Sequence, residues 1–184
     1  MVDEKIVKEA RKIIEGFFKG EEIEPDIEGE AGVFVTLKKG EELRGCIGVP
    51  IPMDLKKALK EAALGAINDP RFPPVREEEM SEIRIEVSVL TPPQIVKDPL
   101  KEIKIGKHGV IVRYGPYSGL LLPQVPIEQG WSLEEFLDYA CLKAGLPPGC
   151  WKNKEIEVYK FEAKIFEELE PKGKVVERKL DEEQ

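Results

Sequence analysis

The sequence contains little that would indicate a membrane, secreted or nucleic-acid-binding protein. No apolar run approaches the roughly 20 residues that a membrane-spanning helix needs. The first residues, Met1-Val-Asp-Glu-Lys-Ile6, lack the basic and then apolar character of a signal peptide. Basic residues number 28 against 36 acidic ones, and a formal net charge of −8 argues against the basic face that nucleic-acid binding requires. These absences predict a cytoplasmic protein that binds neither a membrane nor nucleic acid.

Cysteine and histidine are also scarce, which limits the chemistry open to the chain. The three cysteines, Cys46, Cys141 and Cys150, include no Cys-x-x-Cys spacing, and His108 is the only histidine. Because a structural zinc site needs four closely spaced Cys or His ligands, the sequence predicts no metal site. It also contains no cofactor motif, so no cofactor is expected. Without a secretory context, the cysteines are expected to be reduced thiols.

What the chain does contain is a composition suited to a packed domain. With 184 residues, 41% of them hydrophobic, it fits one domain or two small subdomains that share a core. The 35% of charged residues is typical of proteins from hyperthermophiles. We therefore expect one domain over residues 1–170 and an acidic C-terminal tail over residues 171–184, with fraying from Glu167 onward.

Hydrophobic spacing predicts three main helices and a set of hairpins. Apolar residues recur at helical intervals over Asp3–Phe18, Asp54–Asn68 and Leu133–Ala144. Asp54 and Ser132 are residue types that cap helix N-termini. Strands are predicted for Ala31–Leu37 with its return arm, Glu82–Leu90, the hairpin within Ile103–Leu122, and Ile156–Phe166 with a phase slip. Strands mixed with helices and joined by hairpins, rather than by regular βαβ repeats, predict an α+β fold with mostly antiparallel sheets.

The most distinctive motif is Leu43-Arg-Gly-Cys-Ile-Gly48, on the return arm of the first hairpin. It sets the Arg44 guanidinium two positions from the Cys46 thiol, between two glycines. Because a nearby cation favours the reactive thiolate, Cys46 is a candidate nucleophile. The alternative is that Cys46 is a small buried core residue. In a regular strand Arg44 and Cys46 would share a face, whereas a bulge at Gly45 would alter that.

Two other segments carry candidate site residues. Glu86 shares a strand face with Arg84 and Ser88, so it is a candidate acid, base or ligand-binding carboxylate if that face lines a cleft. The alternative is a solvated outer face with cross-strand ion pairs. Arg71, after the second helix, is a candidate for holding a polar ligand. The alternative there is that Asp69 only caps a turn.

His108 and Gln124 complete the set of polar candidates. His108 is the sole candidate general base, because no other side chain titrates near neutrality without perturbation. It lies in a glycine-flanked turn, which favours an exposed histidine, and nothing places it near Cys46. Gln124 stands beside an apolar strand end, which a structural exit loop would also explain.

These motifs together resemble the AMMECR1 family. The likeness covers nearly the whole chain and rests on Leu43–Gly48, Asp69–Phe72, Glu86–Leu90, Gly119–Val125, and Trp131 followed by Phe136 and Cys141. The resemblance implies two interlocked α+β subdomains, the signature cysteine near a cleft between them, and no known obligatory cofactor. The biochemical activity of the family has no settled assignment.

The sequence and the resemblance together favour a binding or accessory module that uses the Leu43–Gly48 loop and an adjacent cleft. The expected partner is an unidentified protein or small molecule, and the oligomeric state stays open. The alternative is a thiol-dependent enzyme with Cys46 as its nucleophile, which the single histidine leaves short of catalytic partners. The residues expected to bind are Arg44, Gly45, Gly48, Asp69, Arg71, Glu86 and Gln124.

Overall fold

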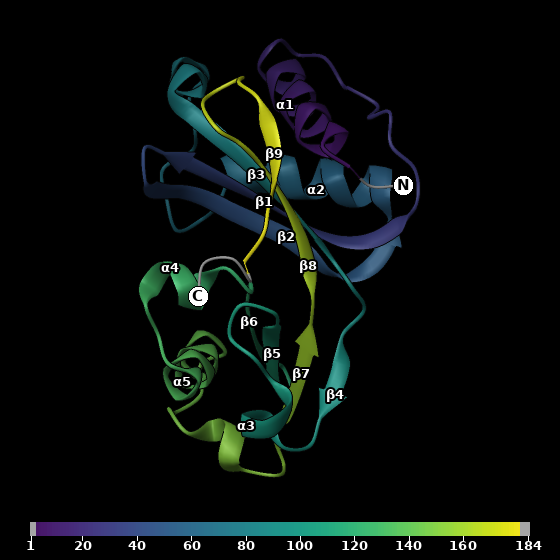
Figure 1. Ribbon diagram of the computed structural model, residues 1–184. Coiled ribbons are helices and arrows are strands. Elements are labelled where there is room, and N and C mark those ends of the chain that lie inside the picture. The colour runs from purple at the N-terminus through teal and green to yellow at the C-terminus, as the bar shows by residue number, and fades with distance from the viewer. Residues whose placement is uncertain (1–2, 181–184) are drawn as a thin grey trace. The chain divides into compact units, whose positions relative to one another are not determined.

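The computed structural model describes residues 3–180, which divide into two compact units (Figure 1). The first unit contains residues 3–91 together with Lys164–Arg178. The second unit contains Pro92–Ala163 together with residues 179–180. The chain therefore leaves the first unit after Thr91 and returns to it at Lys164.

The first unit is built on a five-stranded sheet with the strand order β2-β1-β3-β8-β9. Antiparallel pairing joins β1 to both β2 and β3, and joins β8 to β9. A 3₁₀ helix, η1 (Glu77–Glu82), leads directly into β3. The strands are β1 (Glu30–Lys39), β2 (Glu42–Asp54), β3 (Ile83–Leu90), β8 (Ala163–Glu168) and β9 (Val175–Arg178).

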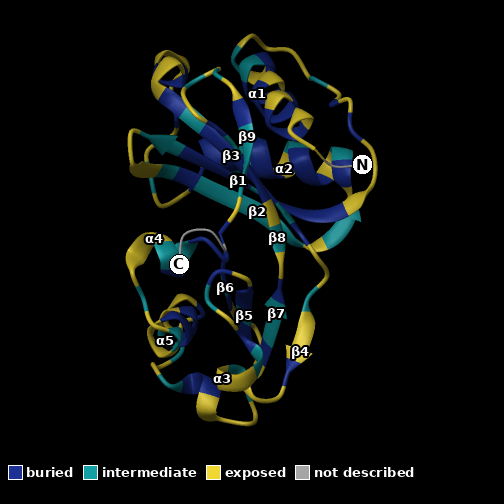
Figure 2. Ribbon diagram, in the orientation of Figure 1, coloured by how far each residue is buried: buried dark blue, intermediate teal, exposed yellow. Residues whose placement is uncertain are grey.

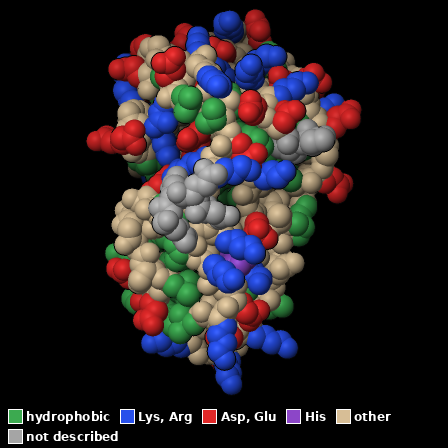
Figure 3. Space-filling model, in the orientation of Figure 1, with side chains coloured by type: hydrophobic (Ala, Val, Ile, Leu, Met, Phe, Trp, Pro, Cys, Tyr) green, Lys and Arg blue, Asp and Glu red, His purple; other side chains and the backbone are tan. Residues whose placement is uncertain are grey.

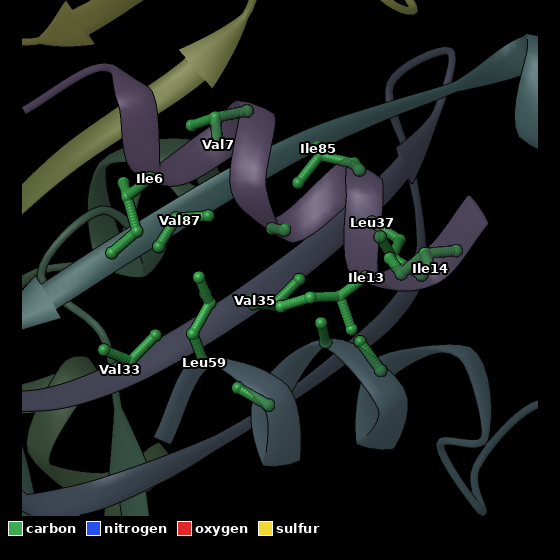
Figure 4. Close-up of a cluster of buried hydrophobic side chains, with 14 of the residues drawn as sticks. Ile6, Val7, Ile13, Ile14, Val33, Val35, Leu37, Leu59, Ile85 and Val87 are labelled. Atoms are coloured by element: carbon green, nitrogen blue, oxygen red, sulfur yellow. The ribbon is translucent and has the colours of Figure 1, made fainter. Parts of the chain in front are cut away.

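Two helices, α1 (Lys5–Phe18) and α2 (Leu55–Ile67), cover one face of this sheet. Because strand side chains alternate between faces, the odd-numbered residues of β1 and β3 point to the helices. Figure 2 shows that the buried residues concentrate in these elements. Figure 4 shows the core side chains that meet there: Ile6, Val7, Ile13, Ile14, Val33, Val35, Leu37, Leu59, Ile85 and Val87. The even-numbered residues of β1 and β3 therefore point to the opposite face.

Both glycines of the Leu43–Gly48 motif lie where another chain segment approaches closely. A Cβ atom at Gly45 would lie 2.2 Å from the carbonyl oxygen of Ala66, at the end of α2. A Cβ atom at Gly48 would lie 2.3 Å from the ring of Phe34. A side chain at either position would force backbone or core atoms to move. The glycines thus let α2 and Phe34 pack directly on β2.

The second unit is built on a four-stranded sheet with the strand order β4-β7-β5-β6. Helix α5 (Leu133–Lys143) packs on this sheet, and its buried side chains share a core with those of β5 and β7. The other elements are β4 (Gln94–Val96), α3 (Pro99–Glu102), β5 (Gly109–Tyr114), β6 (Tyr117–Leu121), α4 (Val125–Gln129), the 3₁₀ helix η2 (Cys150–Lys152) and β7 (Glu157–Phe161).

The α+β class, the two antiparallel sheets and the three main helices are confirmed. The predicted helix caps are also present, since Asp54 accepts a hydrogen bond from the Lys57 N–H and Ser132 accepts one from Glu135. The predicted final strand, Ile156–Phe166, is instead two strands in different sheets, β7 and β8. The break falls at Glu162, whereas the phase slip in the apolar pattern lies earlier, between Val158 and Tyr159.

The expectation that the chain frays from Glu167 is wrong. Strand β8 continues to Glu168, whose carboxylate is buried and receives two hydrogen bonds from Arg11 at 2.8 and 2.7 Å. Strand β9 then pairs with β8. The acidic composition was misleading because a cation from α1 neutralises Glu168, and no local pattern shows such a partner. Residues 181–184 of the predicted acidic tail lie outside the described residues.

The expectation of three reduced thiols is also wrong. Cys141, on the buried face of α5, forms a disulfide with Cys150 at the start of η2. Their Cα atoms lie 5.9 Å apart, within the usual range for this bond. Nine positions separate the two cysteines in sequence, and no motif marks this spacing. The pairing depends on how the chain folds back after α5. The third cysteine, Cys46, is reduced.

Candidate functional site

Three neighbouring strands place a thiol, a hydroxyl and a carboxylate side by side on the sheet face opposite the helices. Thr36 of β1 pairs with Cys46 of β2 on one side and with Glu86 of β3 on the other. The Cys46 Sγ atom lies 3.2 Å from the Thr36 Oγ1 atom. We call Cys46, Thr36 and Glu86 the polar row. Cys46 is partly exposed, whereas Thr36 and Glu86 are buried.

Two cations flank the carboxylate end of the polar row. The Oε1 atom of Glu86 lies 3.7 Å from Nζ of Lys38 and 3.5 Å from Nη1 of Arg178. Lys38 follows Thr36 by two positions on β1, and Arg178 belongs to β9. Glu86 is 3% exposed and Ser88 is fully buried. The alternative of a solvated outer face is therefore wrong at these two residues, although the cross-strand ion pair that it included is present.

The backbone of Cys46 is fixed by the loop that follows α2. Strand β2 lies at the edge of its sheet, where outward-pointing backbone groups have no neighbouring strand. Asp69 accepts a hydrogen bond from the Cys46 N–H at 2.9 Å, and the Arg71 guanidinium donates one to the Cys46 carbonyl at 3.3 Å. Asp69 also accepts bonds from the Arg71 guanidinium at 2.7 and 3.1 Å. This loop therefore sets the position of the thiol.

The Asp69 carboxylate is held in its charged form. Burial raises the pKa of Asp69, but hydrogen bonds outweigh that effect and lower the pKa to about 2 from its ordinary value of 3.8. The donors are the Arg71 guanidinium and the backbone N–H groups of Cys46 and Arg71. A carboxylate with this pKa is a poor proton carrier near neutrality. Its contribution is to position Cys46.

Arg44 contacts a different partner from the one that its spacing suggested. The β1–β2 register shifts between Leu37 and Lys38, and Arg44 is the extra residue of the resulting bulge. Its guanidinium donates to both Glu79 carboxylate oxygens, at 3.0 and 3.1 Å. These bonds are the main cause that lowers the pKa of Glu79 to about 2. The guanidinium with a hydrogen bond to Cys46 is that of Arg71.

Two of the predicted residues, Gln124 and His108, lie in the second unit. Gln124 is 2% exposed and directly precedes α4. His108 is 6% exposed, so the expectation of an exposed histidine is wrong. Because the sequence has no other histidine, the described residues of the first unit contain no imidazole. Binding roles for Gln124, Gly45 and Gly48 stay predictions.

Sequence reasoning missed three members of this arrangement. Thr36 lies between Cys46 and Glu86 because of the register of β1 with β2 and β3, and no local sequence pattern shows that register. Lys38 lies just beyond the predicted strand Ala31–Leu37, and Arg178 lies in the tail that was expected to fray. A signal for Thr36 does exist, because it is a polar residue in an otherwise apolar strand, Val33-Phe-Val-Thr-Leu37.

The described residues show neither a metal cluster nor a membrane span. Within residues 3–180, no three His, Cys, Asp or Glu side chains come together in a group that could hold a metal ion. No helix in the same range combines the length and the apolar character that a bilayer crossing requires.

The fold and the signature motif define a known class of α+β protein. The AMMECR1 family model matches residues 7–166, and the chain belongs to the AMMECR1 family. Protein MJ0810 of Methanocaldococcus jannaschii is 52% identical over 188 residues, covering 95% of this chain and 94% of that protein. Protein NEQ441 of Nanoarchaeum equitans is 52% identical over 177 residues, covering 89% and 98%.

A solved structure confirms the fold. The crystal structure of the uncharacterised protein PH0010 from Pyrococcus horikoshii matches with a TM-score of 0.90 and 48% sequence identity. The match covers 96% of each chain. These relatives come from thermophilic archaea, which agrees with the charged composition. They assign no reaction or ligand.

Proposed function

We propose that this protein is a binding module whose polar row recognises a small polar molecule. The observation that carries the proposal is the alignment of Cys46, Thr36 and Glu86 across three strands, with the thiol 3.2 Å from the hydroxyl. Lys38 and Arg178 extend this set with two positive charges. The row therefore offers a soft sulfur, a hydroxyl that donates and accepts, and groups of both charges.

The energetics of the sheet support a role in recognition. The helix-covered face of the same sheet is apolar, and that face supplies the hydrophobic core. On the opposite face, Glu86 and its cations are largely removed from water, an arrangement that often gives no more stability than apolar side chains of similar size. A charged face that is not needed for the core is typical of a binding or catalytic surface.

The fixed backbone of Cys46 also favours binding. Asp69 and Arg71 occupy both of its outward backbone groups, so the thiol is positioned before any ligand arrives. Such preorganisation lowers the entropic cost of binding, because less of the protein must be ordered in the complex.

The alternative is a thiol-dependent enzyme. Two observations favour it: Cys46 is partly exposed, and the Arg71 guanidinium donates a hydrogen bond to the Cys46 carbonyl. Proton transfer is the weak point, because the Thr36 hydroxyl, which lies 3.2 Å from the thiol, is a poor base near neutrality. Glu86 is flanked by two cations, and Asp69 has a pKa of about 2. We therefore assign the thiol a contact role.

A ligand screen with two readouts tests the proposal. Small polar molecules are screened for those that raise the Tm of the protein, and each hit is tested for slowing the alkylation of Cys46 by iodoacetamide. We expect hits that do both and that lose their effect in Glu86→Gln and Thr36→Val. Glu82→Gln, which changes an exposed carboxylate next to β3, is the matched control and should keep the effect.

Two results count against the proposal. One is a set of hits that raise Tm equally in wild type, Glu86→Gln and Thr36→Val. The other is a set of hits that bind without slowing the alkylation of Cys46.

A further inference from the structure

The second unit gathers positive charge around its histidine. Figure 3 shows the histidine, in purple, enclosed by Lys and Arg side chains. Lys104, Lys107 and Lys160 are the lysines whose charges act on the imidazole of His108. We call these four residues the lysine–histidine cluster. In a chain with a net charge of −8, such a concentration of positive charge requires its own explanation.

The backbone of one tight turn builds most of the cluster. The N–H groups of Lys107 and His108 both donate to the Lys104 carbonyl, at 3.2 and 3.0 Å. Gly106 permits this turn with a left-handed φ of 88°. Lys160 comes from β7, where it pairs with Val110. Val110 follows His108 by two positions, and the charge of Lys160 acts on the imidazole.

The imidazole is oriented so that it can donate a hydrogen bond. Its Nδ1 atom accepts the backbone N–H of Lys104 at 3.0 Å, so Nδ1 carries no proton. Nε2 is therefore the protonated nitrogen of the neutral ring. Burial lowers the pKa of His108 below its ordinary value of 6.5, and the three lysine charges lower it further. The ring is thus a neutral donor at physiological pH.

The three ammonium groups are available for an anion. Within residues 3–180, the side chains of Lys104, Lys107 and Lys160 form no ion pair. Two carboxylates reduce the net positive charge around the imidazole. Glu162 raises the pKa of His108, and the charge of Glu102 is coupled to Lys160 while its carboxylate accepts the N–H groups of residues 97 and 98. The cluster therefore combines three positive charges and one N–H donor, and two negative charges oppose them.

We propose that the lysine–histidine cluster binds the phosphate group of a small molecule. A phosphate monoester carries about −1.5 to −2 charges at neutral pH and has three acceptor oxygens. Lysine ammonium groups are common phosphate ligands because they act as compact point charges. The dianion matches the excess of lysines, and Nε2–H of His108 supplies a directional contact. This site is independent of the polar row in the first unit.

The histidine is also the reporter that tests the proposal. Because His108 is the only histidine of the sequence, its imidazole NMR signals need no assignment. The full chain is titrated with inorganic phosphate at constant ionic strength, with chloride as the compensating anion. We expect a saturable shift of the imidazole signals. The bound dianion should also raise the pKa of His108, because negative charge stabilises the imidazolium.

Lysine variants show whether the cluster holds the anion. Lys107→Met and Lys160→Met should each weaken phosphate binding by about tenfold, the effect of removing one charged contact. Lys154→Met removes an exposed lysine from another loop of the same unit and should change nothing. A shift that never saturates, or that is equal in all three variants, would overturn the proposal.

The source of the phosphate is resolved by comparing probes. Tighter binding of glycerol 3-phosphate than of inorganic phosphate supports an organic phosphate as the ligand. A short single-stranded oligonucleotide that binds more tightly than either would overturn the proposal in favour of a nucleic-acid surface.

Discussion

The two units of this protein use cysteine in opposite ways. In the first unit, Asp69 and Arg71 fix the backbone of Cys46, and the sulfur is left beside a hydroxyl. In the second unit, the sulfur atoms of Cys141 and Cys150 themselves fix the chain. A disulfide-bonded cysteine stabilises the fold. A cysteine that is positioned through its backbone still has a free thiol, which can contact other molecules.

The second unit supports its disulfide with a further anchor. Asp138 of α5 accepts hydrogen bonds from the Gly149 N–H and from the Trp151 indole N–H, both at 2.8 Å. The segment after α5 is therefore tied down by a covalent bond and by two hydrogen bonds. Among the described residues of the first unit no disulfide supports Asp69, which accepts the Cys46 N–H and also holds the Arg71 guanidinium. We expect the loss of that anchor to have the larger effect.

The largest effect is expected from Asp69→Ala. This change removes the buried acceptor of the Cys46 N–H and the partner of Arg71, and the backbone donor is left without a partner. We expect the free energy of unfolding to fall by about 3 kcal/mol. Guanidinium denaturation measures it. Asp98→Ala, at an exposed carboxylate, is the control, and a loss below about 1 kcal/mol for Asp69→Ala would contradict its anchoring role.

Removal of the disulfide should have the next largest effect. The bond spans nine residues, and closing a loop of this size stabilises a protein by about 2.5 kcal/mol in the chain-entropy model. The double variant Cys141→Ala/Cys150→Ala should lose about this much, as should wild type unfolded under reducing conditions. If a reductant leaves the unfolding midpoint unchanged, the disulfide makes no such contribution.

Acid should weaken the Asp69 anchor in a defined pH range. The pKa of Asp69 is lowered to about 2 in the folded protein from 3.8. The carboxylate therefore contributes stability above about pH 4, and this contribution is lost as the pH falls toward 2. Its size is about 2 kcal/mol, from 1.36 kcal/mol per pKa unit. Urea unfolding between pH 2 and 6 measures it.

Asp69→Asn is the variant that isolates this contribution. Its stability should depend less on pH over the same range, because residue 69 no longer titrates. Glu79 acts in the same direction, since its pKa is also lowered to about 2, so part of the dependence should remain. An unchanged pH dependence in Asp69→Asn would show that other groups cause it.

The smallest effect on stability is expected from Cys46→Ala. The thiol is partly exposed, and its Thr36 contact is one weak hydrogen bond. The free energy of unfolding should change by less than about 1 kcal/mol. A loss as large as that of the disulfide variant would mean that the sulfur of Cys46 is also structural, and the contrast between the units would disappear.

Local patterns in the sequence were enough to predict the fold class and the main helices. The spacing of apolar residues predicted α1, α2 and α5. The residue types of Asp54 and Ser132 predicted the N-caps of α2 and α5. The alternation in Glu82–Leu90 predicted β3, and it placed Glu86 and Ser88 on one face. These features depend on interactions over a few residues, which a sequence displays directly.

The features that the sequence did not predict depend on contacts between distant segments. The pairing of Thr36 with both Cys46 and Glu86 depends on strand register. The partnership of Glu168 with Arg11 joins residues 157 positions apart. The candidate site was therefore predicted as separate residues, Cys46, Asp69, Arg71 and Glu86, but their arrangement was not. The bulge at Arg44, whose guanidinium contacts Glu79, likewise depends on the register of β1 with β2.

The rate at which Cys46 is alkylated distinguishes a positioned contact from an activated nucleophile. Because Cys141 and Cys150 are bridged, iodoacetamide should add one label to the native protein, at Cys46, and mass spectrometry follows its rate. If Cys46 is a positioned contact, it should react at neutral pH no faster than N-acetylcysteine. A rate well above that of N-acetylcysteine, lost in Arg71→Met, would instead identify Cys46 as an activated nucleophile.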